Sequence, residues 1–258
     1  MNNAWRLAFF AASLILLAPA VWHVAGGMPS FGMPSSEYGP TVNAILPSAR
    51  HITNMVAAVN FDVRGIDTLG EECILVCAVT GTVVLLRAMR HEDATAKAGR
   101  LPGRKIAQRT DATTLVSRAA AALILLFGVY MVLHGTVTPG GGFQGGVIAA
   151  SSFMLLYLGE GYRAWQRLMR IAIMDILEGG GTFIFVAAAA LPLAFGYAAL
   201  ENTLPYGQPK DLFSGGLILI ANFAVGLSVA GSFGALLVDF MEQTRASRSK
   251  SITDGEDS

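Results

Sequence analysis

Long apolar runs separated by short polar stretches dominate this sequence. A helix of about 20 apolar residues is long enough to cross about 30 Å of hydrocarbon. Five such runs are clear, and a sixth is weaker and rich in small residues. The five cover residues 7–25, 69–89, 119–133, 171–200 and 212–238, and the sixth covers residues 142–158. The pattern predicts an all-α, polytopic membrane protein with about six transmembrane helices.

The composition agrees with this prediction. The chain has 258 residues, of which 53% are hydrophobic and only 14% are charged, and its mean hydropathy is +0.53. An ordinary globular domain has about 25% charged residues. The first apolar run also resembles a signal peptide, because Arg6 precedes it and residues 18–20 form a loose cleavage pattern. The run is longer than the usual core of a signal peptide, so we expect an anchored helix.

Lys and Arg residues gather in a few segments, and their placement predicts the orientation of the helices. Of the eighteen Lys and Arg residues, all except Arg50, Arg64 and Lys210 lie at residue 6, within residues 87–118, within residues 163–170 or after the last run. The positive-inside rule places such segments in the cytoplasm. Both termini are then cytoplasmic and the number of crossings is even, which requires the weak sixth run to cross as well.

A polar, basic segment separates two hydrophobic modules. The predicted division is a two-helix module at residues 1–90, a cytoplasmic linker at residues 91–110, a four-helix module at residues 111–241 and a disordered tail at residues 242–258. Residues 41–60 are only moderately apolar, so we expect one lateral or re-entrant helix at the outer face there. Contact with anionic membrane lipid explains the basic linker without any nucleic acid.

A glycine-rich stretch, HGTVTPGGGFQGG at residues 134–146, lies between two apolar runs. No Lys-Ser or Lys-Thr pair follows its glycines, so it is not a phosphate-binding loop. We expect instead a tight hairpin followed by a helix face of small side chains, on which other helices pack closely. The residues that form the hairpin and the packing face are Pro139, Gly140, Gly141, Gly142, Gly145 and Gly146.

Two further polar residues lie in or next to the predicted spans. Asn222 lies inside the last one and is expected to hydrogen-bond across helices. His134 lies near the outer end of a helix. It either takes part in an ion path or only reaches to the membrane interface.

Acidic residues at two places are candidates for an ion path. Asp175 and Glu178 share a helix face, and Glu178 lies about 12 Å from the cytoplasmic helix end at 1.5 Å per residue. Such depth indicates a function, unless a neighbouring subunit or backbone groups hold the carboxylate. The other candidates are Asp62, Asp67, Glu71 and Glu72. Asp62, Asp67 and Glu71 either pair with Arg64 or form an access point for cations. The sequence shows no catalytic arrangement and no cluster of metal ligands.

Four short motifs of the second module carry a resemblance to a known family. They are TPGGGFQGGVI at residues 138–148, Glu178-Gly179, LPYG at residues 204–207 and LFSGG at residues 212–216. Together they resemble the MnhB subunit of the Mrp (Mnh) multisubunit sodium/proton antiporters. In the first module, residues 54–71 include NFDVRGIDTLGE and resemble the C-terminal end of the large MnhA subunit of these antiporters. In membrane-bound hydrogenases, the counterpart of this C-terminal end is a separate small subunit. The chain thus resembles a fusion of two membrane modules.

The resemblance implies a component of a Mrp-type complex that exchanges cytoplasmic sodium for external protons in the cell membrane of a bacterium or archaeon. It implies partners similar to MnhA, MnhC, MnhD, MnhE, MnhF and MnhG, the larger of which carry the main proton-conducting groups. It implies no cofactor besides the transported sodium ion and proton. Two alternatives stay open: the membrane arm of a redox-driven pump such as a membrane-bound hydrogenase, and a purely architectural subunit.

Overall fold

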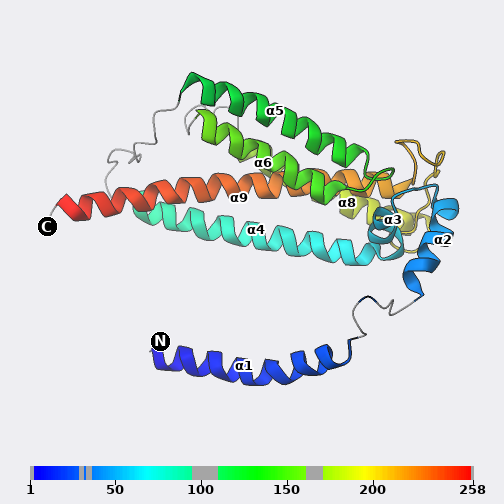
Figure 1. The fold of residues 1–258 in the computed structure, drawn as a ribbon, viewed down its shortest axis with the longest axis horizontal. Helices are drawn as coiled ribbons and strands as arrows, with labels where there is room; N and C mark the ends of the chain where they lie inside the picture. Colours follow the sequence, from blue (N-terminus) through cyan, green and yellow to red (C-terminus); the bar gives the residue numbers. More distant parts are fainter. Residues whose placement is uncertain (1–2, 29–31, 33–36, 95–109, 161–170, 257–258) are drawn as a thin grey trace. The chain divides into compact units, whose positions relative to one another are not determined.

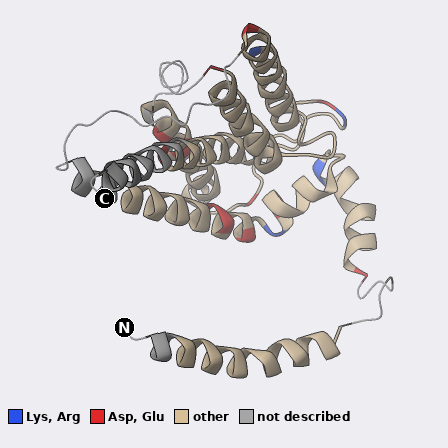
Figure 2. Cartoon of the chain, turned by 60° about the vertical axis from the view of Figure 1, so that its left-hand side comes forward, with Lys and Arg blue, Asp and Glu red and all other residues tan. Residues whose placement is uncertain are grey.

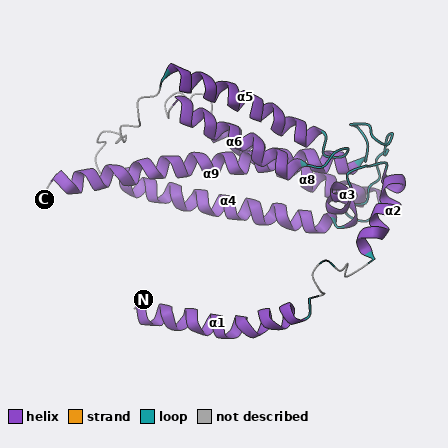
Figure 3. Ribbon diagram, in the orientation of Figure 1, coloured by secondary structure: helices purple, strands orange, loops and turns teal. Residues whose placement is uncertain are grey.

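The computed structural model (Figure 1) describes residues 3–28, 32, 37–94, 110–160 and 171–256. Six of the described helices are long and apolar enough to cross a membrane. Their membrane-length parts are Leu7–Gly26, Gly65–Leu86, Asp111–Leu133, Gly142–Glu160, Ala172–Phe195 and Leu217–Leu237. Within the described residues all regular structure is helical (Figure 3). The predicted all-α, multi-pass architecture is confirmed, including the weak sixth run.

The chain divides into two compact units, residues 1–43 and residues 44–258. The first unit contains helix α1 (Asn3–Gly26) and the start of α2 (Tyr38–Arg50). None of the membrane-length part of α1 is buried within the chain. An apolar helix of this kind needs lipid or another protein to cover its surface.

The second unit is a bundle built around its last helix. The elements that follow α2 are α3 (Met55–Ala58), the π-helix η1 (Val59–Val63), α4 (Gly65–Ala94), α5 (Asp111–Leu133), α6 (Gly142–Glu160), α8 (Ile171–Ala190), the 3-10 helix η2 (Leu191–Phe195) and α9 (Leu217–Glu256). Helix α9 packs against α4, α6 and α8, and α5 packs against α6. The membrane-length part of α9 is 72% buried, against 17–33% for the other four helices of the unit. Charged residues are sparse along the described parts of these helices (Figure 2).

The single lateral helix expected at residues 41–60 is wrong, because several shorter helices occupy this region. Helix α2 ends at Arg50, and His51 has a φ angle of 52°, which a right-handed helix cannot contain. Asn54 then starts α3, because its side chain accepts hydrogen bonds from two backbone N–H groups in the first turn of that helix. No helix of membrane length is described in this region.

The C-terminal tail also differs from its prediction. Helix α9 continues through Glu256, so the residues expected to be disordered are helical as far as that residue. Glu242 and Gln243, which follow the apolar run, are good helix formers and let the helix extend. Most of the basic linker lies outside the described residues, since α4 extends to Ala94 and α5 begins at Asp111.

Glycines bring α5, α6 and α9 so close together that added side-chain atoms would collide. A Cβ atom on Gly128 of α5 would lie 2.8 Å from the backbone nitrogen of Ala149 in α6. A Cβ atom on Gly146 of α6 would lie 2.8 Å from the carbonyl oxygen of Gly226 in α9. The packing face of small residues predicted from the sequence is therefore confirmed.

The turn between α5 and α6 is the predicted tight hairpin. Gly140 and Gly141 have φ angles of 144° and 152°, which favour glycine. Asn54, from the first sequence module, holds the turn in place. Its Nδ2 donates to the carbonyl oxygen of Gly135 at 2.7 Å and to that of Thr138 at 3.0 Å.

Asn222 joins the ends of α5 and α6 to α9. Its side chain is fully buried. Its Nδ2 donates to the carbonyl oxygen of Val132 at 2.7 Å, and its Oδ1 accepts from the backbone N–H of Gly142 at 2.6 Å. Both backbone groups lie at helix ends, where no intrahelical partner is available. The predicted hydrogen bonding of Asn222 across helices is confirmed.

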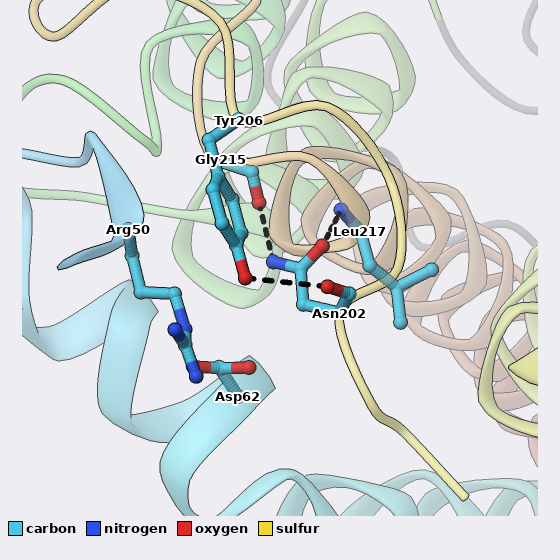
Figure 4. A network of polar contacts seen from close by, with 6 residues as sticks. All are labelled: Arg50, Asp62, Asn202, Tyr206, Gly215 and Leu217. Atoms are coloured by element: carbon cyan, nitrogen blue, oxygen red, sulfur yellow. Dashed lines mark hydrogen bonds and ion pairs between the residues drawn. The ribbon is translucent and has the colours of Figure 1, made fainter. Parts of the chain in front are cut away.

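A polar network fixes the loop that precedes α9 (Figure 4). Nδ2 of Asn202 donates to the carbonyl oxygen of Gly215, and Oδ1 of Asn202 accepts from the backbone N–H of Leu217, both at 2.8 Å. The hydroxyl of Tyr206 donates to the carbonyl oxygen of Asn202 at 3.2 Å. The loop is thereby tied to the first turn of α9.

Arg50 connects this loop to η1. Its guanidinium lies 5.4 Å from the centre of the Tyr206 ring, and its Nε donates to Oδ2 of Asp62 at 2.5 Å. The hydrogen bond to Asp62 raises the pKa of Arg50 above its ordinary value, so the guanidinium stays charged at physiological pH. Of the pairings with Arg64 that the sequence left open, that of Asp67 is observed, on the first turn of α4. Asp62 pairs with Arg50 instead.

We expect Gly142→Ala to destabilise the second unit. The new methyl group would lie 2.7 Å from the backbone nitrogen of Gly226, so α6 must move away from α9, at a cost of about 1–3 kcal/mol. The matched control is Gly81→Ala in α4, because a Cβ atom there meets no other heavy atom within 4 Å. Thermal unfolding in mild detergent is the measurement. Equal melting temperatures for the two variants would contradict the packing described.

We also expect Arg50→Leu to destabilise the fold by about 1.5–3 kcal/mol, because it removes a hydrogen bond to a charged group that remains buried. The side chain of Asp62 is only 7% exposed. In the control Arg64→Leu, the lost partner Asp67 is 45% exposed, so the expected cost is about 0–1 kcal/mol. Melting temperatures of both variants test this order, and a larger loss for Arg64→Leu would contradict it.

Candidate ion-path site

Two carboxyl groups meet the central helix inside the bundle. Glu72 lies about two turns into α4 and is only 2% exposed. Glu178 lies in α8 and is partly buried. Oε2 of Glu72 and Oε1 of Glu178 are buried and have no hydrogen-bond partner among the described residues. The two side chains are close enough for their charges to interact.

Hydroxyl groups of α9 and α8 lie around these carboxyl groups. Ser228 and Ser232 are fully buried on one face of α9. Ser228 interacts with the carboxyl group of Glu72, and its hydroxyl is 3.1 Å from that of Thr182. Ser232 faces the carboxyl group of Glu178, although its own hydroxyl makes no hydrogen bond to a described residue. Ser228 therefore lies between Glu72 of α4 and Thr182 of α8, and Ser232 lies beside Glu178.

Glycines position Glu178 against α9. A Cβ atom on Gly181 of α8 would lie 2.6 Å from the carbonyl oxygen of Ala224. A Cβ atom on Gly231 of α9 would lie 2.6 Å from the carbonyl oxygen of Met174 and 3.0 Å from the Cα atom of Glu178. Contact at this distance brings the backbone of α8 directly onto α9, so a carboxyl group on α8 reaches the serines.

A small cavity adjoins Glu72 at the end of the bundle that carries the α5–α6 turn. This turn-end cavity has a volume of about 50 Å³. A water molecule needs about 10–15 Å³ of such space, so a few waters fit. The polar side chains and turn glycines that line the cavity are Asn60, Thr68, Glu71, Glu72, Gly140, Gly141, Gly142 and Gln144.

A larger groove adjoins Glu178 between α4 and α8. It has a volume of about 520 Å³. Thr80 of α4 and Asp175, Glu178 and Thr182 of α8 supply its polar lining. Glu72 thus faces one hollow and Glu178 faces the other, with the hydroxyl groups between them.

Three described basic side chains are paired elsewhere and do not neutralise this site. Arg50 pairs with Asp62, Arg64 pairs with Asp67, and Arg118 pairs with Glu160. An ionised carboxylate in a low-dielectric environment is costly without a counter-charge. The site is therefore suited to take up a positive charge from outside the chain.

The structure separates the predicted site residues into groups. Glu72 and Glu178 come together, whereas Glu71 is exposed at the turn-end cavity and Asp175 is exposed in the groove. His134 caps the end of α5 and stacks on Tyr130, with 4.0 Å between ring centres. Asp62 and Asp67 form the ion pairs described above. Sequence reasoning missed Ser228, Ser232 and Thr182, whose only signal is the spacing of small polar residues on facing helices.

Comparison with known proteins identifies the family of the second module. Residues 112–235 match the family described as "Domain related to MnhB subunit of Na+/H+ antiporter". The "Putative antiporter subunit mnhB2" of Staphylococcus saprophyticus is 31% identical over 116 residues, which cover 45% of this chain and 81% of the relative.

Two solved structures resemble nearly the whole chain. A chain of the membrane-bound sulfane sulfur reductase, an archaeal respiratory membrane complex, matches with a TM-score of 0.68 and 28% identity over 91% of this chain and 98% of that chain. A chain of the Mrp complex from a Dietzia species matches with a TM-score of 0.64 and 22% identity over 93% of this chain and 26% of that chain. The second match shows a common fold. With its second module matched throughout, this chain belongs to the MnhB family of multisubunit antiporter components.

Proposed function

We propose that this chain serves a Mrp-type cation/proton antiporter as one of its membrane subunits, in which Glu72 and Glu178 carry ions. One observation supports the ion-carrying role above all others. Two carboxyl groups, each with a buried oxygen that has no partner among the described residues, lie within electrostatic range of each other inside predicted membrane spans.

The chemistry of such a pair favours exchange. Two ionised carboxylates at this depth are costly, because each loses its hydration and each repels the other. A proton on one of the two carboxyl groups removes most of this cost, and so does a bound cation. Since either one neutralises the same charge, arrival of a cation favours departure of the proton. This competition is the elementary step that an antiporter needs.

The hydroxyl groups give the proton a route between the two carboxyl groups. Ser228 interacts with Glu72 and is hydrogen-bonded to Thr182, and Thr182 lies one turn from Glu178 on the same face of α8. A hydroxyl both donates and accepts a hydrogen bond, so it can pass a proton on without holding a charge.

The two modules each supply half of this site, which supports their fusion in one chain. Glu72 belongs to the module that resembles the C-terminal end of MnhA, and Glu178 belongs to the MnhB-like module. The Staphylococcus relative matches only 45% of this chain, whereas the match to the Mrp complex extends over 93% of it within a longer chain. On this proposal the fusion keeps both carboxyl groups in one polypeptide.

The proposed setting is the cell membrane of a bacterium or archaeon, with both termini in the cytoplasm. The distribution of Lys and Arg residues supports this orientation. The α5–α6 turn and the turn-end cavity then lie toward the outer face, and the proposed partners are the remaining membrane subunits of the complex. The chain itself acts as a transporter component rather than an enzyme.

A second function is favoured by one of the structural matches. The chain of the archaeal respiratory membrane complex is covered over 98% of its length, so the same arrangement of modules occurs in a sulfane sulfur reductase. As the membrane arm of a redox-driven pump, this chain would use the same carboxyl groups. Purification of the tagged chain from its native membrane, followed by mass spectrometry, separates the two, because only a pump brings iron–sulfur subunits with it.

We expect Glu178→Gln and Glu72→Gln each to lower cation-driven proton movement at least about tenfold, since neither amide can release a proton or carry a negative charge. The measurement is proton movement in everted membrane vesicles that contain the complete complex. The amount of co-purifying subunits should stay unchanged in both variants.

The matched control is Asp67→Asn, which removes a carboxylate that is exposed and paired with Arg64. Its transport should stay close to that of the unchanged protein. Normal transport in both Glu variants with full assembly would favour the purely architectural alternative.

A further inference from the structure

We infer that the turn-end cavity is a binding site for a monovalent cation, with Glu72 as its anionic ligand. The inference rests on the proposed transport function, because the bound cation would be the one that is exchanged. The cavity volume of about 50 Å³ accommodates one ion and a few water molecules, since each water needs about 10–15 Å³.

The burial of Glu72 and its place in the cavity wall indicate a ligand. Its side chain is only 2% exposed, it lines the cavity, and its Oε2 has no hydrogen-bond partner among the described residues. Buried polar atoms in folded proteins almost always have a partner. A buried carboxylate oxygen at the wall of a cavity is placed to bind a positively charged occupant.

Other oxygen atoms of the wall complete the coordination. The hydroxyl of Thr68 donates to the carbonyl oxygen of Asn60 at 2.6 Å, so its oxygen remains free to accept a cation. Oε1 of Gln144 lies at the Gly141 wall, only 3.2 Å from where a Cβ atom on Gly141 would be. Carboxylate, hydroxyl and amide oxygens are the ligands that hard cations prefer.

The charge of the cavity favours a monovalent ion. Glu72 is its only buried carboxylate among the described residues, because Glu71 is exposed at the cavity edge. The remaining wall includes apolar side chains such as Phe61 and Val225, which cannot offset extra charge. One positive charge neutralises Glu72, whereas a divalent ion would leave a net positive charge in an apolar surrounding.

Equilibrium binding of radioactive sodium to the purified complex in detergent tests the inference. We expect Glu72→Gln to weaken sodium binding at least about tenfold, a loss of about 1.4 kcal/mol. Gln144→Leu removes a neutral ligand and should weaken binding about threefold, with the carboxyl pair intact. The control Asp67→Asn removes an exposed, paired carboxylate from the same helix and should leave binding unchanged.

Several outcomes would overturn the site. They are unchanged sodium binding in Glu72→Gln, an equal loss in Asp67→Asn, and displacement of sodium by an equal concentration of magnesium or calcium. If the Glu72→Gln variant does not assemble, sodium binding to the Gln144→Leu variant is the test instead. Undiminished sodium binding in that variant counts against the site. Transport lost with sodium binding retained in Glu72→Gln overturns the site and leaves the proposed function standing. If Glu72→Gln loses sodium binding but keeps normal transport, the site stands and the proposed function is overturned.

Discussion

Close approach of helix backbones at glycine is the constraint on which the rest of this structure depends. Lipid does not drive apolar helices together, so contact must come from backbone packing and from polar groups that reach across. At Gly128, Gly146 and Gly226 the helices touch where a single methyl group would part them. Asn222 bridges the ends of α5 and α6 only because these helix ends lie so close to α9.

The same constraint creates the candidate ion path. Gly181 and Gly231 bring α8 onto α9, and the carboxyl group of Glu178 consequently lies beside Ser232. Glu72 approaches the opposite side of the same serine face from α4. Packing and function are therefore not separate properties here, because the residues that let the helices meet also decide which polar groups lie together.

The sequence reveals much of the local structure and little of the site. Pro139 and the glycines after it predict the hairpin, and Asn222 predicts a bond across helices, because each is unusual within an apolar run. Nothing along the chain shows that Glu72 meets Glu178, since their pairing depends on how α4 and α8 pack on α9. Ser228 and Ser232 look like ordinary small packing residues. Asp62 pairs with the more distant Arg50 because α2 ends at Arg50, and that end depends on the unusual backbone of His51.

On the proposed function, a proton and a cation compete for one pair of buried carboxyl groups. Proton release on addition of sodium to the purified complex in weakly buffered solution, followed with a pH indicator, tests it most directly. We expect proton release from the unchanged complex and its loss when either Glu72 or Glu178 is replaced by Gln. Release that persists undiminished in both variants, or no release from the unchanged complex, would contradict it.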